Sequence, residues 1–301
     1  MASWRDALRG GTALINEGGL SETPALDAQL LLAFATGASR AEVLAHGERM
    51  LRSSERETFG ALVARRAAGE PVAYLIGSRE FMGLRIKTDR RALIPRPETE
   101  LLVEALLAAM RARHEADGVA LSVADIGTGT GAIALALATH APWLGRIFAT
   151  DISPDALALA RENAEQLGLD EVVTFLEGDL LAPLPEPVDV LAANLPYVAR
   201  RDEVTLPVPV RSYEPALALY GDDEGLAAYR RFFAQAPDYC RVGGLVGVEF
   251  GYNQRAAIEA LAREAFPGAA VRIGADYAGW DRYALVWTPS APTPAKESDA
   301  T

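Results

Sequence analysis

The stretch VADIGTGTGAIALALA, residues 123–138, decides the fold. An apolar run typical of a buried strand leads into three alternating glycines, Gly127, Gly129 and Gly131, and an apolar helical run follows. Glycine has no Cβ, so its backbone can turn sharply and approach a bound ligand closely. The third glycine of the dinucleotide fingerprint would fall at Ala132, which argues against a nicotinamide cofactor. The stretch therefore predicts a strand, a ligand-binding turn and a helix.

Strands and helices alternate on both sides of this stretch. A helix precedes it from Thr99 onward, and downstream the chain runs through RIFATDI, a helix that Ser153 caps and Gly168 ends, VVTFLEGD and VDVLAAN. The segment LVGVEFG, one further helix and two late strands, AVRI and RYALVW, complete the pattern. Such alternation predicts a parallel sheet with helices on both faces. We therefore expect an α/β fold for residues 99–289.

The N-terminal part, residues 1–77, has a different pattern. Short helical patterns are separated by capping signals, and we predict one helix from Pro24 and another behind a capping box at Ser39. A third capping box is predicted where Ser54 precedes Glu57 by three positions. These signals indicate a small all-α domain.

Two further segments flank the α/β domain. In residues 78–98, apolar and charged side chains alternate with the period of a half-exposed strand, and Gly83 suits the turn of a hairpin. Pro95 and Pro97 stiffen the exit of this segment, so we expect a β-hairpin linker. Residues 290–301 are rich in Pro, Ser, Thr and Ala without apolar periodicity and predict a disordered tail.

The overall composition narrows the kinds of partner. The 301 residues carry 29 basic and 41 acidic side chains, and the net charge of −12 opposes binding of a phosphate backbone. A single cysteine, Cys240, excludes an internal disulfide framework, and the three histidines are too far apart for a zinc pattern, so we expect no metal site. The N-terminus lacks a secretory signal, and the longest apolar run, residues 132–138, is too short to cross a bilayer. We expect a cytoplasmic monomer with no membrane partner.

Polar residues follow the strands at one edge of the predicted sheet. Asp151 ends RIFATDI, where a carboxylate can bind ribose hydroxyls; its alternative role is to cap the next helix, for which Ser153 is better placed. Asp179 ends VVTFLEGD, where it either accepts a hydrogen bond from a purine amino group or is a solvated turn residue. Ligands of open α/β folds bind at the carboxyl ends of the strands. Together with ADIGTGTG, these residues resemble the S-adenosylmethionine-dependent methyltransferases.

The next strand delivers NLPY, residues 194–197, to the same edge. A buried carboxamide without a partner costs about 1–3 kcal/mol, so Asn194 needs one in the fold or in a substrate. The segment is either a plain turn with a half-buried tyrosine or a site for methyl transfer to a planar nitrogen. In the second interpretation the Asn194 oxygen and the Leu195 carbonyl accept the two N–H bonds of the target. Tyr197 packs on the flat group, and Pro196 fixes the preceding backbone.

The whole chain is similar to the HemK/PrmC family, the N5-glutamine methyltransferases that modify the glutamine of the GGQ motif in peptide-chain release factors. The similarity rests first on GEPVAYLIG (69–77) and PRPETE (95–100), which discriminate this family from other methyltransferases. It extends through DIGTGTGAIAL, TDISPDALALARENA, NLPY, YEPALALYGDDEGLAAYRRF, GGLVGVEFGYNQ and DRYAL.

The resemblance implies a seven-stranded, Rossmann-like class I methyltransferase domain whose last strand is antiparallel. It also implies a helical N-terminal domain that helps to seat the release factor, a β-hairpin linker, and S-adenosyl-L-methionine as cofactor. The implied catalytic residues, which also contact the target glutamine in the GGQ loop, are Asn194, Leu195, Pro196 and Tyr197. The implied cofactor contacts are Gly127, Thr128, Gly129, Thr130, Gly131, Asp151, Asp179, Leu180 and Asn194.

Leu195 departs from the family pattern, which usually has proline at this position. NLPY is also found in enzymes that dimethylate adenines of small-subunit ribosomal RNA, so an adenine-N6 methyltransferase acting on RNA or DNA is the alternative function. The backbone carbonyl survives a change from proline to leucine, and the acidic charge without a basic run disfavours RNA. We therefore place glutamine methylation first. A ribosomal protein as substrate, and the choice among release factors, stay open.

Overall fold

The computed structural model describes residues 2–222 and 224–290, so the tail expected from residue 290 onward lies, but for Ser290, outside the described residues. By its contacts the chain forms two compact units. The first comprises the residues up to Glu80 together with Arg85–Ile94 and Arg201–Leu219, and the second comprises the rest. The first unit thus includes a segment from later in the chain, Arg201–Leu219.

The first unit is helical, as its capping signals predict. A capping box at Ser39 is confirmed, because the Ser39 Oγ accepts the Glu42 N–H at 3.2 Å while a Glu42 oxygen accepts the Ser39 N–H at 2.8 Å. The predicted box at Ser54 is wrong, since the helix begins at Ser53 and the Arg52 N–H is bound by the Glu55 carboxylate at 2.8 Å. The helices are α1 (Trp4–Gly18), α2 (Pro24–Thr36), α3 (Arg40–Ala45), α4 (Ser53–Ala67), α5 (Val72–Ile76), α9 (Val208–Tyr213) and α10 (Ala216–Leu219), with a 3₁₀ turn at Arg200–Thr205.

Specific contacts bind the three segments of the first unit to each other. The buried Glu214 carboxylate accepts the Ile94 N–H at 3.1 Å. The Tyr213 hydroxyl donates to the Ala68 carbonyl at 3.2 Å, and the Arg90 guanidinium lies 4.9 Å from the centre of the Tyr213 ring. The mid-chain segment is therefore a structural part of this unit.

The second unit contains the predicted seven-stranded sheet, in the order β5-β4-β3-β6-β7-β9-β8. All neighbours are parallel as far as β7, and β9 is antiparallel to both β7 and β8, so the antiparallel last strand is confirmed. The strands are β3 (Val123–Ile126), β4 (Ile147–Asp151), β5 (Val173–Glu177), β6 (Val188–Ala193), β7 (Cys240–Glu249), β8 (Ala270–Ala275) and β9 (Asp281–Trp287).

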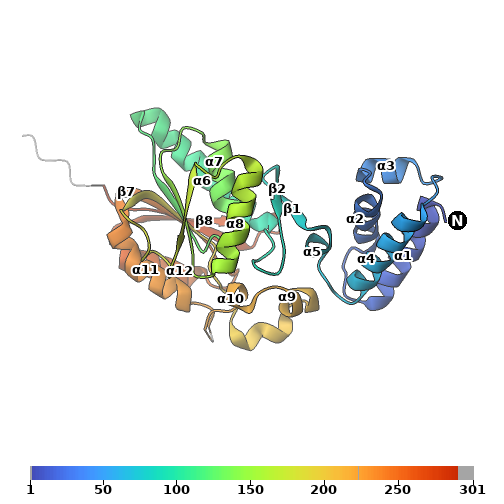
Figure 1. Cartoon of the computed structure of the whole chain (residues 1–301). Coiled ribbons are helices and arrows are strands. Elements are labelled where there is room, and N and C mark those ends of the chain that lie inside the picture. The colour runs from blue at the N-terminus through green and yellow to red at the C-terminus, as the bar shows by residue number, and fades with distance from the viewer. Residues whose placement is uncertain (1, 223, 291–301) are drawn as a thin grey trace, which may run out of the picture. The chain divides into compact units, whose positions relative to one another are not determined.

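The strand order decides where the helices lie. From the centre of the sheet, β3, β4 and β5 run outward in one direction, and β6 and β7 run outward in the other. Parallel crossovers are right-handed, so the two directions place their helices on opposite faces (Figure 1). The point where the direction reverses, between β3 and β6, is where open α/β sheets bind ligands. The helices are α6 (Pro97–Asp117), α7 (Ala132–His140) and α8 (Pro154–Leu167) on one face, and α11 (Ala227–Tyr239) and α12 (Arg255–Ala265) on the other.

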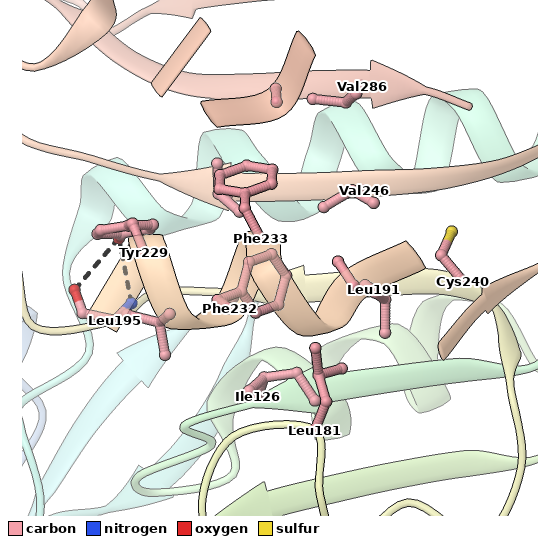
Figure 2. Close-up of a cluster of buried hydrophobic side chains, with 14 of the residues drawn as sticks. Ile126, Leu181, Leu191, Leu195, Tyr229, Phe232, Phe233, Cys240, Val246 and Val286 are labelled. Atoms are coloured by element: carbon pink, nitrogen blue, oxygen red, sulfur yellow. Dashed lines mark hydrogen bonds between the residues drawn. The ribbon is translucent and has the colours of Figure 1, made fainter. Parts of the chain in front are cut away.

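The main apolar core lies between the sheet and α11 with α12. Phe232 and Phe233, in a T-shaped pair 5.3 Å apart, pack among side chains such as Leu191 and Val246 from the central strands (Figure 2). Burial of each phenylalanine contributes about 1.5–3 kcal/mol. The ends of β6 and β7 are consequently held on a rigid base.

A hairpin precedes the sheet, as predicted, with its turn at Met82 and Gly83 between β1 (Ser78–Phe81) and β2 (Leu84–Lys87). Both turn residues have positive φ, 50° and 74°, and glycine at the second position adopts this conformation without strain. The Met82 N–H donates to the Glu100 carboxylate at 2.9 Å, which fixes the turn to α6. That helix begins at Pro97, two residues before the predicted Thr99, because proline suits the first turn of a helix.

Candidate active site

The glycine loop joins β3 to α7, as predicted from the sequence. Gly127, Gly129 and Gly131 have φ of 73°, 56° and 83°, a region in which a side chain is strained. The N–H groups of Gly127 and Thr128 both donate to the Thr150 carbonyl at 2.9 Å, which winds the loop over the end of β4. A Cβ at Gly127 would stand 3.1 Å from the Leu195 side chain. The glycine loop and the NLPY turn are therefore direct neighbours.

Asp151 stands at the end of β4 and binds this loop. One carboxylate oxygen accepts the Gly129 N–H at 2.9 Å, and the other accepts the Ser153 N–H at 2.9 Å. Ser153 itself caps α8 as predicted, because its Oγ accepts the Ala156 N–H at 3.2 Å. Burial raises the pKa of Asp151, and the backbone N–H bonds oppose that rise. A carboxylate has about four lone-pair sites, so Asp151 can accept further hydroxyl donors.

A buried acid supports the loop from below, and sequence reasoning missed it. The Asp125 carboxylate accepts the Thr128 hydroxyl at 2.6 Å and the Ala134 N–H at 3.1 Å, so it caps α7 from the preceding strand. Its second oxygen, Oδ1, has no hydrogen-bond partner among the described residues. Burial raises the pKa of Asp125 to about 7. The Thr130 carbonyl accepts the Asn163 side chain at 2.9 Å. The sequence did contain a signal for Asp125, because it is an acidic residue inside an apolar strand and lies two positions before Gly127.

Asp179 and Leu180 follow β5 at the same edge of the sheet. Leu180 has a φ of 51°, and its carbonyl accepts the Thr150 hydroxyl at 2.9 Å, which ties this turn to the end of β4. The Asp179 carboxylate is paired with Arg231 at the surface. Exposed ion pairs contribute little, typically about 0–1 kcal/mol, so this one does not prevent Asp179 from accepting another donor.

The NLPY turn follows β6 and is fixed by a buried hydroxyl. Tyr229, from α11, accepts the Leu195 N–H at 3.2 Å and lies 3.2 Å from the Leu195 carbonyl (Figure 2). The same hydroxyl donates to the Glu249 carbonyl at the end of β7. Tyr229 has one hydrogen for two carbonyls, and each carbonyl has two lone pairs, so the Leu195 carbonyl retains acceptor capacity. The side chain of Leu195 is buried.

Asn194 finds its expected partner in the fold. Its Nδ2 donates to the Thr99 hydroxyl at 3.1 Å, and Thr99 donates to Glu249 at 2.6 Å. The other Glu249 oxygen accepts the Tyr197 hydroxyl at 3.3 Å, and the Tyr197 carbonyl accepts the Gln254 side chain at 3.0 Å. Glu249 is 1% exposed, and this burial raises its pKa to about 7. Sequence reasoning missed Thr99 and Glu249, although Glu249 ends an apolar run as Asp151 does.

These residues lie together at the carboxyl edge of β3, β4, β5, β6 and β7. The site contains a glycine turn in which Gly127 is exposed, the Asp151 carboxylate and the half-buried Asn194 carboxamide. No group of three or more His, Cys, Asp or Glu that could hold a metal ion occurs within residues 2–222 and 224–290. In the same part of the chain, no helix has the length and apolar character needed to span a membrane.

Comparisons with known proteins identify the family. The model of the PrmC N-terminal domain matches residues 6–77, and a methyltransferase-domain model matches residues 118–215. Among solved structures, the hMettl16 catalytic domain in complex with MAT2A 3′UTR hairpin 1 is 21% identical, with a TM-score of 0.53 over 77% of this chain and 84% of that chain. A methyltransferase from Pyrococcus furiosus is 16% identical, with a TM-score of 0.50 over 69% and 90%. These two share the fold.

Curated relatives are much more similar. The release factor glutamine methyltransferase of Moorella thermoacetica is 43% identical over 284 residues, which cover 94% of this chain and 98% of the relative. That of Cereibacter sphaeroides is 39% identical over 286 residues, which cover 95% and 99%. Because this identity extends over nearly the full length of both sequences, the chain belongs to the family of release factor glutamine methyltransferases.

Proposed function

We propose that this protein transfers a methyl group from S-adenosyl-L-methionine to the side-chain nitrogen N5 of the glutamine in the GGQ motif of peptide-chain release factors. The observation that carries the proposal is the Asn194 carboxamide, which is held by Thr99 beside the glycine loop. Family membership supports the choice of substrate, because the curated relatives are named for it.

The residues of the glycine loop fit such a cofactor. A Cβ at Gly127 would press on the Leu195 side chain at 3.1 Å, and all three loop glycines have positive φ, so the loop favours residues without a side chain. When bound, S-adenosylmethionine supplies an electrophilic methyl group on sulfur. The proposed contacts are Gly127, Thr128, Gly129, Thr130, Gly131, Asp151, Asp179, Leu180 and Asn194.

The target side chain needs orientation more than activation. An amide nitrogen is a weak nucleophile because its lone pair is delocalised. The proposed acceptors of its two N–H bonds are the Asn194 Oδ1 and the Leu195 carbonyl, which lie on consecutive residues of one fixed turn. Pro196 and Tyr197 complete the proposed contact. Neutral acceptors of this kind also offset the positive charge that develops on nitrogen.

The test is transfer of labelled methyl groups to a purified release factor. We expect label on the glutamine of the GGQ motif and none when that glutamine is replaced by alanine. Label that persists in the alanine substrate would reject the proposed target. Label that enters RNA and not protein would instead support the adenine alternative, which shares the NLPY turn.

Replacing Asp151 by asparagine should weaken cofactor binding by about 10- to 100-fold. The carboxylate accepts backbone N–H groups on both of its oxygens, and an amide NH₂ would confront one of these donors. Calorimetric titration with S-adenosylmethionine would measure the loss. The matched control is Asp155→Asn, at an exposed carboxylate in the first turn of α8. Equal affinities for the two variants would exclude Asp151 from the cofactor site.

A further inference from the structure

We propose that Thr99 and Glu249 are positioning residues that determine which end of the Asn194 carboxamide faces the target nitrogen. The inference rests on the proposed function and deepens it, because it explains why the site accepts an N–H donor. It follows from counting hydrogen atoms along three side chains that the fold brings together from α6, β6 and β7.

The count begins at Glu249. An ionised carboxylate can only accept hydrogen bonds, so both hydroxyls that contact it, those of Thr99 and Tyr197, must donate. Thr99 has a single hydroxyl hydrogen and commits it to Glu249 over 2.6 Å. Its oxygen can then only accept a hydrogen bond.

The count ends at Asn194. The group 3.1 Å from the Thr99 oxygen must be the donor end of the carboxamide, which is Nδ2. The acceptor end, Oδ1, is thereby directed away from Thr99. Without this contact, the Asn194 carboxamide could turn by 180° at little cost. The Glu249 carboxylate, two hydrogen bonds away, therefore selects one of its two orientations.

Protonation of Glu249 would remove this selection. A neutral carboxyl can donate to Thr99, which frees the Thr99 hydrogen to bind Asn194 Oδ1 and lets the NH₂ turn outward. The pKa of Glu249 also depends on its charged and titratable neighbours: Arg282 on β9 and the hydrogen bond from Tyr197 lower it, and Glu98 on α6 raises it. The Tyr229 hydroxyl of α11 faces the same residue. Burial is the largest contributor and raises the pKa of Glu249 to about 7. Turnover should therefore be full above this pKa and fall as the pH drops through it.

The orientation also determines specificity. With Oδ1 outward, the site binds the NH₂ of glutamine and repels a glutamate side chain, which presents only acceptor oxygens. A release factor carrying GGE in place of GGQ should therefore compete poorly with the GGQ substrate for the wild-type enzyme. It should compete better when the carboxamide is free to turn.

The experiment compares Glu249→Gln, Thr99→Val and Thr99→Ser, with Glu264→Gln at an exposed site as the matched control. We expect Glu249→Gln and Thr99→Val to lower kcat by about 10- to 100-fold with cofactor affinity nearly unchanged. Thr99→Ser, which keeps the hydroxyl, should restore kcat to within about threefold. In Glu249→Gln, the fall in kcat on the acid side should disappear, and the GGE protein should inhibit more strongly.

Stability separates positioning from a purely structural role. The raised pKa means that ionised Glu249 costs folding free energy above that pKa, so Glu249→Gln should keep or raise Tm at pH 8 while kcat falls. Wild-type kcat in both Glu249→Gln and Thr99→Val would overturn the inference. So would losses of kcat that follow losses of Tm.

The inference and the proposed function fail in different ways. If the wild type labels the GGQ glutamine and the variants behave like it, only the inference fails. If the wild type labels no glutamine, the NMR signals of the Asn194 side-chain amide still report on the network. Protected Nδ2 protons that lose protection in Thr99→Val would support it, and unprotected protons in the wild type would refute it.

Discussion

Replacing Asn194 by alanine is expected to reduce methyl transfer about a thousandfold while cofactor affinity falls less than tenfold. The substitution removes the proposed acceptor of the target nitrogen and leaves the glycine loop and Asp151 with their own bonds intact. Single-turnover assays with labelled S-adenosylmethionine and a release factor would measure transfer, and titration would measure affinity.

Asn194→Asp is the informative companion because it has the same shape. Its second oxygen would face the Thr99 oxygen, whose hydrogen is committed to Glu249, so two acceptors would meet without a proton. We expect it to be nearly as inactive as the alanine variant. Near-normal turnover in either variant would remove Asn194 from its proposed role.

Gly225→Ala is expected to damage both stability and turnover. Gly225 has a φ of 74°, and a Cβ there would lie 2.1 Å from the Tyr197 carbonyl oxygen. That carbonyl is fixed by Gln254 at 3.0 Å, so the backbone of the NLPY turn must shift to relieve the clash. Overpacking and positive-φ strain together should lower the free energy of unfolding by about 2–4 kcal/mol. The displaced turn should lower kcat by about tenfold or more.

Gly118→Ala is the matched control, because Gly118 has a φ of 67° and a Cβ there would meet nothing within 4 Å. It should cost only the conformational strain, about 1–2 kcal/mol, and leave kcat unchanged. Urea unfolding and steady-state assays would compare the two variants. Equal losses of stability and of kcat in the two variants would mean that the contact with Tyr197 has no effect on either.

The fold was predictable wherever the decisive signal was local. Ser153, Pro154 and Gly168 mark the ends of α8 within a few residues, and the structure confirms all three. The start of α4 was missed because Arg52-x-x-Glu55 and Ser54-x-x-Glu57 have the same spacing, and in the structure it is the Glu55 carboxylate that binds a backbone N–H, that of Arg52. The placement of residues 201–219 in the first unit depends on contacts with positions far away in sequence, which no local pattern records.

The candidate site divides along the same line. The glycines and Asp151 could be identified from the sequence because each sits at the end of a predicted strand. Glu249 has a similar signal at the end of an apolar run, but its pairing with Thr99 could not be predicted, because that contact arises only when β6 and β7 pair and α6 packs over them. Tyr229 is hidden for the same reason, since within α11 it has the appearance of an ordinary core aromatic.

The composition of the first unit has a consequence for how the protein is made. The ribosome synthesises the chain from its N-terminus, and early domains ordinarily fold while later ones are still being made. Here the carboxylate that binds the Ile94 N–H belongs to Glu214, and the ring beneath Arg90 belongs to Tyr213. Four strands of the sheet, β3 to β6, emerge before either residue does. The unit that begins first is thus finished late, and a nascent chain that ends just after β6 carries both an incomplete N-terminal unit and an incomplete sheet.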